Sequence, residues 1–190
     1  MDIRVARSLM TLMTVSSLHA ADSVLTIEPG SSQVTFTLQA TAHKVHGTFA
    51  VASGEVRFDP AGGMASGSIV VDATSGDTDN KKRDKKMHLA VLRSGEYPRI
   101  VFEPVSFSGS FDPAGGGELQ VSGILQLLGI DHEVKLPVEV AVDGDALRMR
   151  ASLTVPYVEW GLKDPSFFVL RVGKTVQVEI DLVGRLVADP

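Results

Sequence analysis

The chain alternates hydrophobic and polar residues over long stretches, a pattern typical of β-strands with one dry face and one wet face. The alternation is most regular between Leu119 and Leu182, where it predicts four consecutive strands. Their hydrophobic positions are Leu119, Val121, Leu125 and Leu127; Val134, Leu136, Val138, Val140 and Val142; Leu147, Met149, Leu153 and Val155; and Val176, Val178, Ile180 and Leu182. Polar residues fill most positions in between, so each strand can bury one face.

The same alternation continues upstream in shorter runs and raises the total to about eight or nine strands. These runs contain Val34, Phe36 and Leu38; Phe49 and Val51; Val56 and Phe58; Ile69 and Val71; and Ile100 and Phe102. Proline or glycine residues lie between strands at residues 59–63, 112–117 and 143–145, as in hairpin turns. We therefore predict an all-β fold, an antiparallel β-barrel of about eight strands, whose interior is filled by side chains or holds one small ligand.

One stretch, residues 79–92, departs from the strand pattern and predicts a short helix. It contains no strand breaker, and Asp77 or Asp79 is expected to cap its N-terminus. Its first half is strongly basic, with five lysine or arginine residues between Lys81 and Lys86. This basic run is interpreted either as a solvated helix face or as a cationic surface beside an apolar opening.

The first twenty residues have the order of an export signal. Arg4 and Arg7 precede a modestly apolar run at residues 9–18, and small residues follow. The run is too short to span a bilayer. We expect cleavage near Ala21 or Asp22, a single mature domain at residues 21–190, and a location in the periplasm or outside the cell; a poorly structured cytosolic tail is the alternative.

Composition limits the stabilising chemistry and the partners. The 190-residue chain contains no cysteine, so neither a disulfide framework nor a lipid-modified cysteine is expected. The formal net charge is −5, and such a surface repels nucleic-acid phosphates. We therefore expect no nucleic-acid partner.

No catalytic signature is recognisable, and we predict that the protein is not an enzyme. No serine has the spacing of a nucleophile elbow, and the carboxylates form no acid and base pair. His43, His46 and His88 could together hold a metal, but they come from separate segments, so we expect neither a metal nor a cofactor. A site built on these histidines remains an alternative. His132 and Trp160 are expected to be structural.

Several segments resemble the YceI-like family in order and spacing. They are residues 47–49 (Gly-Thr-Phe), 53–59 (Ser-Gly-Glu-Val-Arg-Phe-Asp), 68–73 (Ser-Ile-Val-Val-Asp-Ala), 83–84 (Arg-Asp), 97–102 (Tyr-Pro-Arg-Ile-Val-Phe), 123–129, 134–136, 160–162 and 176–180. The resemblance implies a secreted, lipocalin-like barrel with an elongated apolar tunnel. It also implies that the protein carries or sequesters a long-chain amphiphile such as an isoprenoid lipid, an isoprenoid quinone or a fatty-acid derivative.

The alternation selects the residues expected to line this tunnel: Phe36, Leu38, Phe49, Val71, Phe102, Leu125, Leu127, Leu136, Val138, Met149 and Leu153. Four further residues are expected near its opening: Met87, Leu89, Phe167 and Phe168. The polar residues expected at the tunnel mouth are His43, His46, Arg83, His88 and Arg171. Transient contact with a membrane surface and formation of a homodimer stay open, as does a structural or partner-binding barrel with a filled interior.

Overall fold

The computed structural model describes residues 23–41, 43–59, 63–112, 115–166 and 171–188. Its elements in chain order are β1 (Ser23–Ile27), η1 (Pro29–Ser31), β2 (Gln33–Ala40), β3 (Lys44–Asp59), β4 (Met64–Asp72), η2 (Ala73–Ser75), α1 (Lys81–Lys86), η3 (Met87–Val91), β5 (Arg99–Asp112), β6 (Gly116–Leu127), β7 (Ile130–Asp143), β8 (Ala146–Val155) and β9 (Val172–Ala188). The predicted export signal and residues Phe167 and Phe168 lie outside the described residues.

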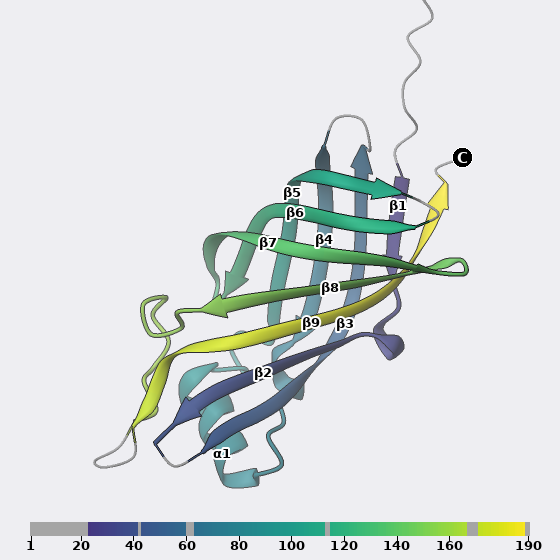
Figure 1. The fold of residues 1–190 in the computed structure, drawn as a ribbon. Coiled ribbons are helices and arrows are strands. Elements are labelled where there is room, and N and C mark those ends of the chain that lie inside the picture. The colour runs from purple at the N-terminus through teal and green to yellow at the C-terminus, as the bar shows by residue number, and fades with distance from the viewer. Residues whose placement is uncertain (1–22, 42, 60–62, 113–114, 167–170, 189–190) are drawn as a thin grey trace, which may run out of the picture.

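The strands form a closed antiparallel barrel (Figure 1). Strands β2 to β9 pair in the order β3, β2, β9, β8, β7, β6, β5, β4, and β4 returns to pair with β3. Closure leaves no unpaired sheet edge in this ring. The predicted all-β barrel of about eight strands with one short helix is confirmed.

Strand β1 shares one position in the ring with β2. Both β1 and β2 pair antiparallel with β3 on one side and with β9 on the other. The turn η1 separates them and begins with Pro29, whose nitrogen has no hydrogen to donate to a ladder. The nine strands of the described residues therefore fill eight places around the barrel.

Two register shifts change which residues face the interior. In β3 a shift between Val51 and Ser53 moves the inward set from odd to even positions. In β5 a shift between Pro104 and Ser106 moves it from even to odd positions. An extra residue in one strand has this effect because side chains alternate with a period of two.

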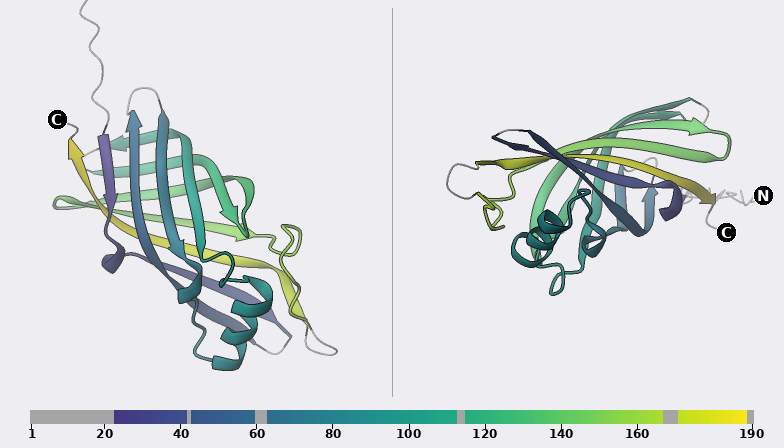
Figure 2. Two further views of the ribbon diagram at one scale, coloured as in Figure 1. Left: turned by 180° about the vertical axis from the view of Figure 1, so that it is seen from behind. Right: turned by 90° about the horizontal axis from the view of Figure 1, so that it is seen from below.

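The barrel has two distinct ends (Figure 2). We call one the helix end: it carries α1, η3 and the connections β2–β3, β6–β7 and β8–β9. We call the other the hairpin end: it carries the connections β3–β4, β5–β6 and β7–β8, the start of β1 and the end of β9.

The N-cap of the helical segment is neither of the two predicted residues. Asn80 is the N-cap of α1, and its side chain accepts a hydrogen bond from the Arg83 backbone nitrogen. The expectation for Asp77 or Asp79 is wrong, because the Asp77 carboxylate instead accepts from the Asp79 backbone nitrogen at 2.7 Å and Asp79 has a positive φ of 58°. The last turn, η3, is a π-helix. Among the described residues, no helix has the length and apolar character needed to cross a membrane.

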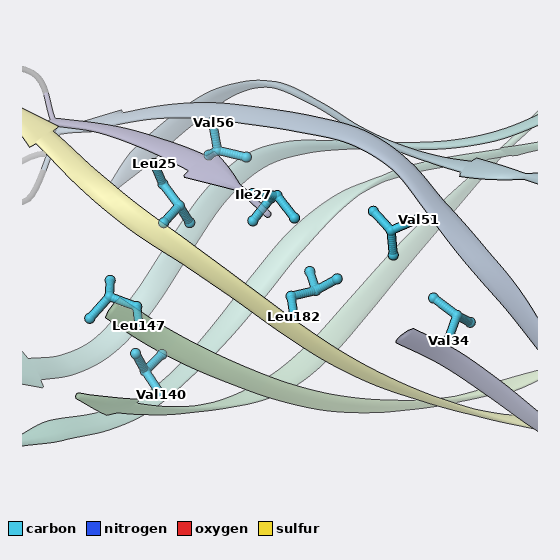
Figure 3. Close-up of a cluster of buried hydrophobic side chains, with 8 residues drawn as sticks. All are labelled: Leu25, Ile27, Val34, Val51, Val56, Val140, Leu147 and Leu182. Carbon is cyan, nitrogen blue, oxygen red and sulfur yellow. The ribbon is translucent and has the colours of Figure 1, made fainter. Parts of the chain in front are cut away.

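A cluster of buried hydrophobic side chains lies toward the hairpin end. Figure 3 shows eight buried residues of this cluster: Leu25, Ile27, Val34, Val51, Val56, Val140, Leu147 and Leu182. Ile27 and Val51 are 3% and 4% exposed, respectively. Burial of this kind stabilises a barrel that contains no disulfide.

Candidate functional site

The barrel encloses an apolar cavity of about 660 Å³. This volume lies within the range of small-molecule sites, about 300–1,000 Å³. Its lining runs from Met87 and Ile100 at the helix end to Phe58, Phe107 and Phe111 near the hairpin end. The described side chains therefore leave an elongated apolar space inside the barrel, as the alternation allows.

The structure brings most of the predicted interior residues together around this cavity. Those in its lining are Phe36, Leu38, Phe49, Val71, Met87, Phe102, Leu125, Leu127, Leu136, Val138, Met149 and Leu153. They come from seven strands and from η3, and inward positions on a strand recur every two residues except across the register shifts in β3 and β5.

Other expected residues are placed differently. Leu89 is 69% exposed and lies outside the cavity lining, because it falls on the opposite side of the helical segment from Met87 and Val91. Phe167 and Phe168 cannot be placed, since they lie outside the described residues. Leu89, expected near the opening, therefore points away from the cavity into solvent.

The polar residues expected at the mouth divide into two groups. His43 and Arg83 line the cavity at the helix end. His46 is exposed and its Nδ1 is 3.0 Å from the Thr37 hydroxyl, on the outer face. His88 and Arg171 are not among the residues that line the cavity.

The alternation also missed residues that line the cavity. Phe58 and Phe111 occupy the same place in the repeated sequence Phe-Asp-Pro-Ala-Gly-Gly, and both face inward. Phe107 was hidden by the register shift in β5, although Ser106, Ser108 and Ser110 show that polar residues take the other positions there. Thr78 and Lys86 complete the polar part of the lining.

Aromatic rings crowd one wall near the helix end, and glycines make room for them. The rings of Phe36 and Phe49 are 5.3 Å apart between centroids. A Cβ atom on Gly47 would lie 2.4 Å from the Phe36 ring, and one on Gly76 would lie 2.5 Å from the Phe49 ring and 2.8 Å from the Met87 methyl. Side chains at these two positions would displace rings of the cavity wall.

A hydrogen-bonded chain holds the Arg83 side chain at the mouth. The Thr78 hydroxyl donates to the Asp84 carboxylate and accepts from Arg83 Nε at 2.7 Å. Arg83 Nη2 also donates to the Thr78 carbonyl at 2.6 Å. Arg83 makes no ion pair with another described residue, so its charge is available to a ligand.

Lys86 is the second cation of the lining. Its Nζ donates to the Pro165 carbonyl at 2.7 Å, which ties the helical segment to the β8–β9 connection. The lining contains no aspartate or glutamate among the described residues. The mouth therefore combines a positive charge with an apolar interior.

His88 links the helical segment to the residues before and after it by hydrogen bonds. Its Nε2 lies 2.8 Å from the Gly76 carbonyl, which can only accept, and its Nδ1 lies 2.9 Å from the Ser94 hydroxyl. With both ring nitrogens engaged, His88 positions η3 and does not face the cavity. In the described part of the chain, no three histidine or acidic side chains form a group that could hold a metal ion.

The β8–β9 connection covers part of the helix end. Trp160 stacks on His132, with ring centroids 4.0 Å apart and an interplanar angle of 7°. Tyr157 is buried, and its hydroxyl donates to the Gly173 carbonyl at 2.7 Å. Burial, aided by the nearby Asp164 carboxylate, raises the pKa of Tyr157 to about 12.

Comparison with known proteins identifies the family. Residues 25–184 match the YceI-like domain. The chain belongs to the YceI-like family. Protein YceI of Escherichia coli O157:H7 is 28% identical over 137 residues, which cover 70% of this chain and 69% of that protein. Protein YceI of Salmonella newport has the same identity and coverage.

Solved structures share the YceI-like fold. BcnA of Burkholderia cenocepacia superposes with a TM-score of 0.68 at 23% identity, covering 83% of this chain and 98% of BcnA. A polyisoprenoid-binding domain from Saccharophagus degradans, implicated in plant cell wall breakdown, gives a TM-score of 0.65 at 16% identity, covering 87% of this chain and 98% of that domain. At these identities the likeness establishes the barrel architecture.

Proposed function

We propose that this YceI-like protein binds one long-chain amphiphile, with the chain in the barrel cavity and the head group at the helix end. It would carry or sequester the lipid in the periplasm or outside the cell without chemical change. The observation that carries the proposal is the continuous apolar lining between Met87 and Phe111, in which the charged side chains of the described residues lie at the mouth.

The apolar lining supports a hydrocarbon ligand on energetic grounds. Each methylene that leaves water for an apolar site contributes about 0.8 kcal/mol, so ten carbons contribute roughly 8 kcal/mol before ordering costs. A free energy of that size corresponds to a Kd on the order of micromolar. Hydrogen-bonding groups along the chain are therefore unnecessary.

The polyisoprenoid-binding domain from Saccharophagus degradans supports an isoprenoid chain among the candidate ligands, because its barrel is built in the same way. Isoprenoid lipids, isoprenoid quinones and fatty-acid derivatives all combine a long apolar chain with a polar end. At the mouth, Arg83 and Lys86 favour an anionic or strongly hydrogen-bonding head group over a basic one.

The direct test is organic extraction and mass spectrometry of the purified protein and of two matched tryptophan variants. Leu125→Trp fills the cavity from the inner face of β6, whereas Gln120→Trp adds the same ring on the exposed outer face of that strand. We expect a co-purified long-chain lipid from the wild type and from Gln120→Trp, and a loss of at least tenfold from folded Leu125→Trp.

Two results would contradict the proposal. Equal lipid in both folded tryptophan variants would place the ligand outside the cavity. Absence of lipid from the wild type, together with no uptake of added fatty acid or isoprenoid alcohol, would favour a structural or partner-binding barrel.

A further inference from the structure

The helical segment presents two different faces. Arg83, Met87 and Val91, spaced by four residues, line the cavity. We call the opposite side the helix outer face: it consists of Lys81, Lys82, Lys85 and Leu89, all of which are exposed. Residues four apart lie on one side of a helix, so Lys81, Lys85 and Leu89 align.

Leu89 is unusual among the large hydrophobic residues of the described chain. Its 69% exposure exceeds that of Met64, at 58%, and of every other described large hydrophobic side chain. It belongs to a face whose remaining members are lysines. An exposed leucine among lysines matches the interfacial side of a membrane-surface helix, where cations meet lipid phosphates and the apolar side chain enters the headgroup region.

The three lysines of the helix outer face have no hydrogen bond or ion pair with another described residue. At the hairpin end the turns carry acidic residues instead: Asp59, Asp112, Asp143 and Asp145. Arg185 pairs there with Asp145 and Glu28. The protein as a whole is acidic, so the helix outer face, with its three lysines, would be the side attracted to a negatively charged surface.

We propose that the helix outer face docks this protein on an anionic lipid bilayer, with the cavity mouth turned toward the membrane. A protein partner is less well matched, because lysine is depleted in the centres of protein interfaces and a single leucine offers little apolar area. A lipid surface needs no complementary groove. Transfer of a ligand in this orientation rests on the proposed function, whereas the docking does not.

The test is vesicle co-sedimentation of the full-length chain. The vesicles contain phosphatidylcholine alone or with about one third phosphatidylglycerol. We expect binding only to the anionic vesicles, and weaker binding as salt rises. Replacing Lys81, Lys82 and Lys85 with glutamine should weaken binding on the order of tenfold or more at low salt.

Matched variants separate this face from general charge and hydrophobicity. Lys135→Gln, Arg148→Gln and Arg150→Gln together remove the same charge from the exposed barrel wall. Leu89→Ser is compared with Met64→Ser, which removes an exposed apolar side chain near the hairpin end. We expect both controls to bind anionic vesicles within about twofold of the wild type and Leu89→Ser to lose about tenfold.

Equal weakening by the wall variant, or unchanged binding of the helix-face variant, would overturn the proposal. The proposal would also be overturned if the protein bound polyglutamate as tightly as anionic vesicles and Leu89→Ser did not weaken that binding. This result would assign the helix outer face to an acidic protein partner. Lipid loading from ethanol is measured in parallel. If the helix-face variant loads normally but fails to dock, both proposals stand; if the wild type docks but never loads, only the proposed function fails.

Discussion

The two ends of this barrel differ in how deeply their inward side chains are buried, although the same alternating strands form both. At the hairpin end, small and branched side chains such as Ile27, Val51 and Leu182 pack against each other and are almost fully buried. At the helix end, Met87 and Val91 are only half-buried and line the apolar cavity. Period-two patterning gives both ends an apolar inside, and the cavity reaches both, because Leu147 and Leu182 of the hairpin-end cluster also line it.

The difference extends to the backbone and to charge. The helical segment is flanked by Asp79 and Arg93, two non-glycine residues with positive φ, at 58° and 48°. Such conformations cost free energy and persist where the surroundings impose them. Cations also gather here, whereas the hairpin turns are acidic. The acidic hairpin turns and the cationic helical segment therefore lie at opposite ends of one barrel.

The comparison predicts that core loss at the hairpin end has the largest effect on stability. Ile27→Ala removes buried methyl groups from a closed cluster and should lower the free energy of unfolding by about 2–5 kcal/mol. Met87→Ala borders existing space and should cost under about 1.5 kcal/mol while weakening lipid uptake. Urea unfolding and lipid loading of both variants measure these effects; equal losses of stability would contradict the division.

A smaller effect on stability is expected at Tyr157, whose hydroxyl holds the β8–β9 connection at the helix end. Tyr157→Phe removes the hydrogen bond to Gly173 and should lower the free energy of unfolding by about 0.5–1.5 kcal/mol at neutral pH.

The same variant sharpens the comparison through pH. Because the pKa of folded Tyr157 is raised to about 12 from its usual value of 10.0, the neutral phenol stabilises the fold below pH 10. That contribution is lost as pH rises from about 10 to about 12. Tyr157→Phe should therefore show a flatter decline of unfolding free energy over this window, and identical declines would mean that Tyr157 ionises equally in both states.

The smallest predicted effect concerns the charge at the mouth. Lys86→Met keeps the apolar stem but removes the ammonium group beside the cavity. We expect it to weaken binding of a long-chain fatty acid about two- to fivefold at low salt and to leave the alcohol of equal length unchanged. Calorimetric titration of both ligands measures this, and equal changes would show that Lys86 does not contact the head group.

Much of this architecture was predictable because hydrophobic and polar residues alternate along a strand that buries only one face. The inward residues of β6 to β9 follow the alternation without interruption. The shifts in β3 and β5 were not predicted, because one extra residue reverses the faces and its partner strand lies far away in the chain. The sharing of one place by β1 and β2 likewise depends on pairing with β9, near the other end of the sequence.

The site was less predictable than the fold. Sequence alternation separates inside from outside, but it cannot say whether inward side chains meet or leave a cavity. It also cannot orient a short helix: Met87 faces the interior and Leu89 faces away, although both are hydrophobic and two residues apart. The histidines illustrate a third limit, because His43 lines the cavity, His46 bonds Thr37 outside and His88 fastens η3.

The central claim is that the cavity buries an apolar chain, and a chain-length series tests it most directly. Affinities of saturated fatty acids of increasing length would be measured by calorimetry on delipidated protein. We expect Kd to fall by about fourfold for each added methylene, equivalent to about 0.8 kcal/mol, until the chain fills the cavity and the gain stops. Affinities that do not depend on chain length would contradict the claim, because they would show that the chain remains in water.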